Sequence, residues 1–238
     1  MLAGSVLSLH RWPVKSLAGE QADALALDVR GVAGDRAHAL YDEFRGHPRR
    51  LTVRQVPRML RWRAAYRDGE VTPDGVPVPT LTAPDGAAYR WDDPALAGAL
   101  AEDLGRPVEL RRDLGLMQDV RDTIHVTTQA TLAALGEELG RPLDVRRFRP
   151  NVHVALDAAP YAEQGWTGRR LRVGGVVLEL LDPCERCVIP TRDPETTVKD
   201  PEILRRLARQ HDTCFGIYAR AAGPGRIAAG DPVELLPA

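Results

Sequence analysis

The chain has 238 residues, with 32 basic and 33 acidic side chains and a formal net charge of −1. This length allows one large or two small domains with hydrophobic cores, and the balanced charge argues against a dedicated nucleic-acid-binding protein. The sequence has no apolar run long enough to cross a bilayer, no signal-peptide pattern at its start, and three cysteines. We therefore expect a cytoplasmic protein without membrane attachment or a secreted disulfide framework.

Short apolar runs separated by turn residues predict strands in the N-terminal part of the chain. These runs cover residues 6–9, 24–29 and 37–41. A stretch rich in Pro, Gly and Asp at 68–86 predicts turns and loops. The sequence then predicts a helix over residues 94–104, with Asp93 as its N-cap and Gly105 at its end.

The C-terminal part alternates two further helices with strands. Thr127 or Thr128 is expected to cap a helix that ends at Gly140, and Asp200 to cap a helix with Pro201 in its first turn. Strands are predicted at residues 152–156, 171–181, 217–220 and 233–236. Many short strands and few helices indicate a mainly β fold of the α+β kind, a β-barrel or sandwich with peripheral helices.

The clearest chemical signal is Cys184-Glu185-Arg186-Cys187, which follows a predicted strand. A C-x-x-C pair places two sulfur atoms on one turn, which can hold a soft metal, support redox exchange or bind zinc. Arg186 beside the thiols favours the thiolate form. The alternative is two partly buried cysteines without chemistry.

A zinc site is a rival interpretation of the same turn. His211 and Cys214 follow with H-x-x-C spacing, so that these two residues with Cys184 and Cys187 could form a Cys₃His set. Two features argue against it. The turn after Cys187 lacks the glycine that usually lets amides fold around the sulfur atoms, and a chain of this size needs no metal to fold.

Basic segments provide candidate contacts to an anion. Lys15 and Ser16 together offer ammonium and hydroxyl donors that suit a phosphate, and the segment 146–151 combines three arginines with an aromatic residue and Asn151. Residues 34–36 and 52–58 are basic as well. For each segment taken alone, a solvated loop or a structural ion pair is the more common explanation. The histidines at 10, 38, 47, 125 and 153 show no ligand spacing, which favours surface or core positions.

Taken in order, these segments resemble the MOSC (molybdenum-cofactor sulfurase C-terminal) family. The similarity is greatest to its two-part members, which include the mitochondrial amidoxime-reducing component and bacterial reductases of N-hydroxylated bases. The matching strings are W-P-V-K-S at 12–16, G-D-R at 34–36, T-V-R-Q-V-P-R at 52–58, T-Q-A-T-L at 128–132, R-F-R-P-N at 147–151, C-E-R-C-V-I-P-T at 184–191, F-G-I-Y at 215–218 and G-D-P-V at 230–233. The resemblance implies an N-terminal MOSC β-barrel segment at 1–110 and a MOSC domain at 111–238, with the boundary near residues 106–118.

The resemblance also implies a molybdenum cofactor, molybdenum bound to molybdopterin, with Cys187 as the ligand to the metal and the catalytic residue. Further contacts to the cofactor are implied at Lys15, Ser16, Arg36, Thr128, Arg149, Asn151, Glu185, Arg186 and Tyr218. Of these, the first three are similar to residues that contact the phosphate or pterin, and Arg149 and Asn151 to a pair that reads the pterin. Thr128 is expected to act through the amides of its helix N-terminus. Glu185 departs from the family pattern, in which a small hydroxyl residue is common.

The implied reaction is the reductive removal of oxygen from a small N-hydroxylated substrate. The sequence shows neither an iron–sulfur domain nor a membrane anchor, so electrons are expected to come from a separate flavin or iron–sulfur protein. One alternative is a non-catalytic carrier or sulfur-transfer protein for the cofactor, which uses Cys187 as a transient thiolate. The other is a zinc-stabilised binding module.

Overall fold

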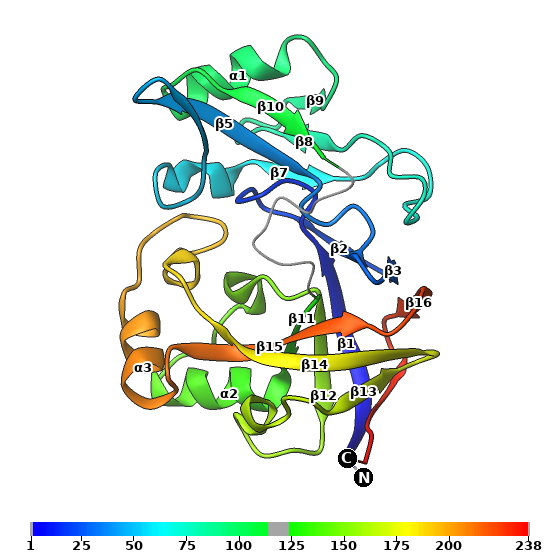
Figure 1. Ribbon diagram of the computed structural model, residues 1–238. Coiled ribbons are helices and arrows are strands. Elements are labelled where there is room, and N and C mark those ends of the chain that lie inside the picture. Colours follow the sequence, from blue (N-terminus) through cyan, green and yellow to red (C-terminus); the bar gives the residue numbers. More distant parts are fainter. Residues whose placement is uncertain (1, 114–123, 238) are drawn as a thin grey trace.

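The computed structural model describes residues 2–113 and 124–237. Figure 1 shows a lower half built on a β-barrel and an upper half of smaller sheets, with both ends of the chain at the far end of the barrel. Seven strands close the barrel, and only β11 and β12 pair in parallel. In ring order they are β1 (Leu2–Arg11), β12 (Val152–Leu156), β11 (Ile124–Thr128), β15 (Cys214–Ala221), β14 (Val176–Glu185), β13 (Arg170–Val173) and β17 (Pro232–Leu235).

The first strand of the chain closes this barrel. β1 pairs with β12 on one side and with β17 on the other, so that Gly4 lies opposite both Leu156 and Val233. A Cβ atom on Gly4 would lie 1.8 Å from the carbonyl oxygen of Ala155. The close approach of β1 to β12 therefore depends on a residue without a side chain.

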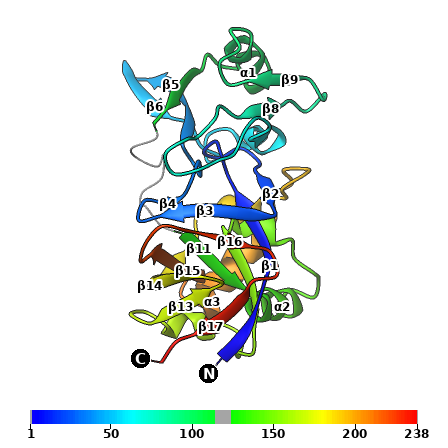
Figure 2. The ribbon, with the colours of Figure 1, turned by 90° about the vertical axis from the view of Figure 1, so that its right-hand side faces the viewer.

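Side chains of the barrel strands alternate between interior and solvent, as in other small barrels. In β13, for example, Leu171 and Val173 are buried, whereas Arg170 and Arg172 are exposed. Apolar side chains from all seven strands form one continuous core with residues of β3, β4 and β16. These three strands are β3 (Ala24–Asp28), β4 (Gly31–Val32) and β16 (Gly225–Ala228). They pair in a small sheet, and Figure 2 shows β3 crossing the waist between the two halves.

The upper half has a second core, which includes the buried indoles of Trp62 and Trp91. Its strands are β5 (His38–Phe44), β6 (His47–Arg50) and β10 (Glu109–Arg112) in one sheet and β7 (Arg63–Ala65), β8 (Thr80–Thr82) and β9 (Ala88–Arg90) in another. β2 (Glu20–Ala22) extends the barrel sheet beside β1. Leucines of α1 (Leu96–Leu104) pack into this second core.

The described residues form two further α-helices, α2 (Gln129–Glu138) and α3 (Glu202–Gln210), which lie against the outside of the barrel (Figure 1). Short 3₁₀ turns occur at η1 (Pro57–Arg61), η2 (Val145–Phe148), η3 (Ala162–Gly165) and η4 (Ile189–Thr191). Within the described ranges, no helix is long and apolar enough to span a bilayer.

The predicted mainly β fold with peripheral helices is confirmed, and so is the cap of α2, where the Thr128 side chain accepts the backbone N–H of Thr131. Two details were wrong. The strand predicted at 171–181 is two strands, β13 and β14, because a tight turn reverses the chain at Gly174. Helices α1 and α3 begin later than predicted, and the Asp93 and Asp200 carboxylates instead accept backbone N–H groups two residues onward.

The predicted division after residue 110 stays a prediction. Residues 114–118 of the proposed boundary lie outside the described residues. The strand pairing adds one fact to this division: β1 begins the chain but belongs to the barrel formed by the C-terminal strands. The N-terminal segment therefore contributes to both halves of the molecule.

Two glycine substitutions test how the barrel closes. Gly4→Ala should lower the free energy of unfolding by about 1–3 kcal/mol, because the new methyl group forces β1 away from the backbone of β12. Gly98→Ala is the matched control, since Gly98 lies in α1 with open space around it, and should raise stability by about 1 kcal/mol. Urea unfolding measures both. Equal effects at the two sites would contradict the packing at Gly4.

Candidate functional site

A cavity of about 670 Å³ is lined by residues from both halves of the molecule, a size typical of small-molecule sites. The upper half contributes loop and strand residues at 15, 16, 36, 50, 52 and 54, and the barrel half contributes the turn after β14 and neighbouring residues. Of the ten site residues expected from the sequence, eight line this cavity: Lys15, Ser16, Arg36, Arg149, Glu185, Arg186, Cys187 and Tyr218. Thr128 and Asn151 are not among its lining residues.

The cysteine turn forms one wall of the cavity. β14 ends at Glu185, so Arg186 and Cys187 lie in the turn before η4. The two cysteines differ in exposure, since Cys184 is buried and Cys187 is only partly buried. Arg186 spans the wall: its Nη1 donates to Cys184 Sγ at 2.8 Å, and its Nη2 donates to the Phe148 carbonyl at 2.8 Å.

The electrostatic environments of the two other cysteines at the cavity are opposite. Burial by itself raises the pKa of the Cys184 thiol, but the Arg186 guanidinium and the His125 and Tyr218 side chains outweigh it. The pKa of Cys184 therefore lies well below its ordinary value, which favours the thiolate. For Cys214, burial and the neighbouring charge of Cys184 raise the pKa, which favours the neutral thiol.

Basic residues line the other side of the cavity. The Lys15 backbone is held by β5, since its N–H donates to the His38 carbonyl at 2.8 Å. Arg36 pairs with the buried carboxylate of Asp35, and its Nη2 lies 3.5 Å from the Arg149 carbonyl. Arg149 Nη1 donates to the Leu17 carbonyl at 2.7 Å. These contacts fix two guanidinium groups from distant segments at one surface.

Three residues of this basic side have backbones in the left-handed region. φ is 69° at Ser16, 50° at Arg36 and 52° at Arg149. Non-glycine residues adopt such angles at a cost, and they concentrate at functional sites. The Ser16 side chain is also buried, and none of the described residues gives its Oγ a hydrogen-bond partner. A buried hydroxyl group of this kind points to a ligand that accepts its hydrogen bond.

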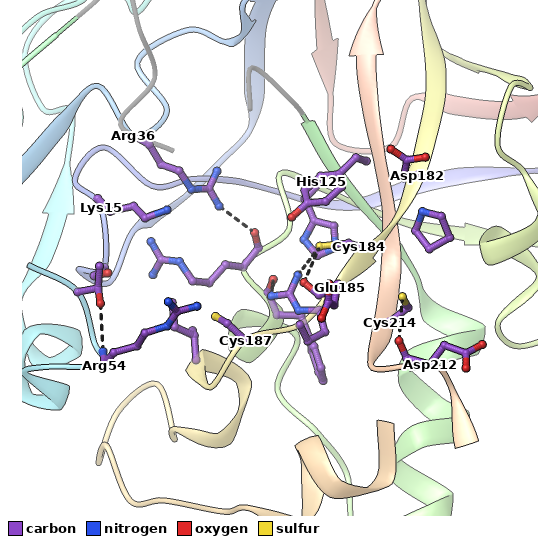
Figure 3. A pocket seen from close by; sticks show the side chains of 18 of the residues that line it. Lys15, Arg36, Arg54, His125, Asp182, Cys184, Glu185, Cys187, Asp212 and Cys214 are labelled. Atoms are coloured by element: carbon purple, nitrogen blue, oxygen red, sulfur yellow. Dashed lines mark hydrogen bonds between the residues drawn. The ribbon is translucent and has the colours of Figure 1, made fainter. Parts of the chain in front are cut away.

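Basic and acidic side chains lie on opposite sides of Cys187 in the cavity. Figure 3 shows Lys15, Arg36 and Arg54 on one side of this cysteine and Asp182 and Asp212 on the other. Both carboxylate side chains belong to exposed residues. An anionic ligand part is therefore favoured on the basic side, with the sulfur of Cys187 between the two charged regions.

Asn151 and Thr128 stabilise the fold beneath the cavity. Asn151 is fully buried: its Oδ1 accepts the His125 N–H at 3.1 Å, and its Nδ2 donates to the His10 carbonyl at 3.3 Å. It thereby connects β11 to β1. Thr128 caps α2, and its hydroxyl lies 3.4 Å from the buried Glu163 carboxylate.

Several lining residues were not expected from the sequence. His125 of β11 is buried, and its Nε2 lies 3.0 Å from the Phe215 carbonyl. Its isolated position gave no sequence signal. Thr52 and Arg54 belong to the basic segment 52–58, for which the sequence predicted no cofactor contact. The remaining lining residues outside the predicted set are Arg50, Phe148, Asp182, Pro183, Cys184, Ile189, Asp212 and Cys214.

The structure does not assemble the rival zinc site. His211 Nε2 lies 3.0 Å from the Glu138 carboxylate, and its ring stacks on Tyr161 with 3.6 Å between centroids. Over residues 2–113 and 124–237, no three His, Cys, Asp or Glu side chains are grouped to hold a metal ion. The four residues of the proposed Cys₃His set are all within these ranges.

Comparison with known families agrees with this geometry. Residues 113–234 match the MOSC domain, and residues 3–89 match the MOSC N-terminal beta barrel domain. The chain therefore belongs to the MOSC family. Among solved structures, the YuaD protein of Bacillus subtilis superposes with a TM-score of 0.53 over 99% of this chain and 96% of its own, at 14% identity. That likeness shows a shared fold.

Curated relatives are similar over part of the chain. Mitochondrial amidoxime-reducing component 1 of Homo sapiens is 34% identical over 124 residues, which cover 47% of this chain and 36% of that protein. Molybdenum cofactor sulfurase of Caenorhabditis briggsae is 36% identical over 96 residues, or 38% of this chain and 13% of that protein. The matched region thus spans 36% or less of the length of these two relatives.

The buried bridge at Asn151 generates a stability prediction. Asn151→Ala leaves the His125 N–H and the His10 carbonyl without their side-chain partner, so the unfolding free energy of the unloaded protein should fall by about 1–3 kcal/mol. Thermal and urea unfolding of both proteins measure the change. An unaltered stability would contradict a structural role for Asn151 and favour a direct contact to a ligand.

Proposed function

We propose that the chain binds a molybdenum cofactor in this cavity and reduces N-hydroxylated small molecules with it. The proposal rests on one observation. Cys187 lines the same cavity as four basic or hydroxyl residues, Lys15, Ser16, Arg36 and Arg149. A cysteine sulfur is a suitable ligand for a soft metal site, and fixed cations suit a phosphorylated organic partner. The names of the curated relatives, which refer to the molybdenum cofactor and to amidoxime reduction, support the same assignment.

The residues of the basic side fit the phosphate and pterin parts of the cofactor. Lys15 supplies a compact charge with three donors, and the buried Ser16 hydroxyl has no other partner among the described residues. Arg36 and Arg149 supply planar guanidinium groups, which suit forked hydrogen bonds and stacking on a flat ring. Cys187 would hold the metal, with Glu185 and Arg186 beside it in the turn.

When bound, the cofactor supplies two-electron oxygen-atom-transfer chemistry. The protein positions it, keeps the thiol of Cys187 at the cavity and leaves the carboxylate side of the cavity for a small substrate. Electrons would come from a separate donor protein that carries flavin or an iron–sulfur cluster. Purified, cofactor-loaded protein with a chemical reductant should convert amidoximes or hydroxylamines, and absence of turnover with every such compound would overturn the proposal.

A second candidate function is a carrier or sulfur-transfer protein for the cofactor. The similarity to molybdenum cofactor sulfurase favours it, and the same cavity would hold the cofactor only transiently. Incubation of loaded protein with a cofactor-free molybdoenzyme separates the two functions. Transfer of cofactor without turnover of N-hydroxylated compounds indicates the carrier, whereas turnover with the cofactor retained indicates the reductase.

The assignment of Cys187 is tested by its removal. Cys187→Ala should lower the molybdenum content of purified protein by at least about tenfold, which corresponds to about 1.4 kcal/mol of binding free energy. Cys214→Ala is the matched control, because Cys214 lines the same cavity but its Sγ lies 3.3 Å from the Asp212 carbonyl. Elemental analysis and oxidised-pterin fluorescence measure loading. Equal loss from both variants would contradict the assignment.

Ser16 should show opposite effects on stability and on loading. Ser16→Ala removes a buried hydroxyl without a described partner, so the unloaded protein should unfold at the same free energy or be stabilised by up to about 1 kcal/mol. Cofactor loading should fall, since the hydroxyl is proposed to contact the ligand. Thermal unfolding and pterin analysis measure the two effects. A destabilised protein with normal loading would indicate a structural hydroxyl.

A further inference from the structure

Cys184 has no part in the function proposed above, although its sulfur lies in the cavity wall. It is 1% exposed and lies three residues before Cys187, near the end of β14. Its Sγ accepts a hydrogen bond from Arg186 Nη1 at 2.8 Å, and Arg186 Nη2 is held by the Phe148 carbonyl at 2.8 Å. Both ends of one guanidinium group are thus anchored in the wall, next to the proposed metal ligand.

We propose that Cys184 is a positioning residue, whose sulfur fixes the Arg186 guanidinium beside Cys187 so that the remaining N–H groups of Arg186 are held ready for the bound ligand. This inference rests on the proposed function for the identity of that ligand. Among the described residues, the buried Nε of Arg186 has no hydrogen-bond partner. Arg186 therefore keeps an N–H group without a protein partner, in a side chain that lines the cavity.

The charges around Cys184 explain why a sulfur atom can serve as this anchor. A neutral thiol is a weak acceptor, whereas a thiolate makes a charge-assisted bond with a guanidinium group. The groups that face the sulfur are Arg186 from its own turn, His125 from β11, and Tyr218 and Cys214 from β15. Arg186, His125 and Tyr218 together lower the pKa of Cys184 against the opposing effect of burial.

The hydrogen bond between Arg186 and Cys184 also explains why the pKa of Cys184 is lowered while that of Cys214 is raised. A partly buried guanidinium group is stabilised by an anionic or strongly polar partner, and Cys184 provides one inside the wall. Without it, Arg186 would keep a single anchor at the Phe148 carbonyl, and its long side chain would regain rotamer freedom. Cys214 lines the same cavity, but its sulfur lies 3.3 Å from the Asp212 carbonyl and its pKa is raised.

The first experiment uses the unloaded protein. Ultraviolet thiolate absorption, titrated with pH, is compared between the wild type, Cys184→Ser and the control Cys214→Ser. The wild type should contain a thiolate component that disappears only well below the ordinary thiol pKa of about 8.5, and Cys184→Ser alone should lack it. A wild-type to Cys184→Ser difference that titrates at or above the ordinary value would overturn the proposal.

A further measurement on the unloaded protein gives the coupling energy between the Cys184 and Arg186 side chains. Unfolding of Cys184→Ala, Arg186→Lys and the double variant forms a double-mutant cycle. The double variant should be no less stable than the more damaged single variant, because each single change already breaks the pair. Purely additive effects would show that Cys184 packs without holding Arg186, and would also overturn the proposal.

The second experiment measures retention of the molybdenum cofactor on dialysis. Cys184→Ala should retain about tenfold less cofactor, Cys184→Asp should recover part of the loss because a carboxylate also anchors a guanidinium group, and Cys214→Ala should match the wild type. Normal retention by Cys184→Ala would overturn the positioning role. A wild type that never retains cofactor would overturn the proposed function instead, while the thiolate titration and the cycle still decide whether Cys184 holds Arg186.

Discussion

The cavity depends on a group of contacts between the two halves of the molecule, centred on Trp12 and the segment before β12. The Trp12 indole N–H donates to the Pro150 carbonyl at 3.0 Å, and the Arg149 guanidinium lies 4.1 Å from the centre of the same indole ring. Arg149 then reaches the Leu17 carbonyl, 132 residues earlier in the chain. Because these bonds join the loop after β1 to the barrel, they hold the basic and sulfur-bearing walls at a fixed separation.

The cavity combines residues with unfavourable backbone angles and residues with cationic side chains, both at the surface that a ligand would contact. Ser16, Arg36 and Arg149 adopt left-handed backbones at the basic wall, and all three residues are buried there. On the opposite wall, a guanidinium group is held by a cysteine sulfur and a carbonyl next to Cys187. A preformed site of this kind binds its ligand with little reorganisation, which is the common basis of tight and specific cofactor binding.

The sequence predicts much of this site because its signals are local. The C-x-x-C turn and the Lys15-Ser16 pair are each visible within a few residues, and family resemblance orders them. The residues that the sequence did not identify act through long-range contacts. His125 has no neighbouring motif and reaches the cavity only because β11 pairs with β15. Asn151, by contrast, was singled out from the sequence as a candidate cofactor contact, and in the fold both ends of its amide connect β11 with β1. The closure of the barrel by β1 is equally invisible in local sequence, since it pairs residues more than a hundred positions apart.

The most direct test of the central claim is a crystal structure of the cofactor-loaded protein, with molybdenum located by anomalous scattering. The account predicts one molybdenum peak in the cavity, bonded to the sulfur of Cys187, with phosphate density at Lys15, Ser16 and Arg36. Molybdenum bound elsewhere on the protein, or a cavity whose Cys187 sulfur contacts no metal in fully loaded crystals, would contradict it.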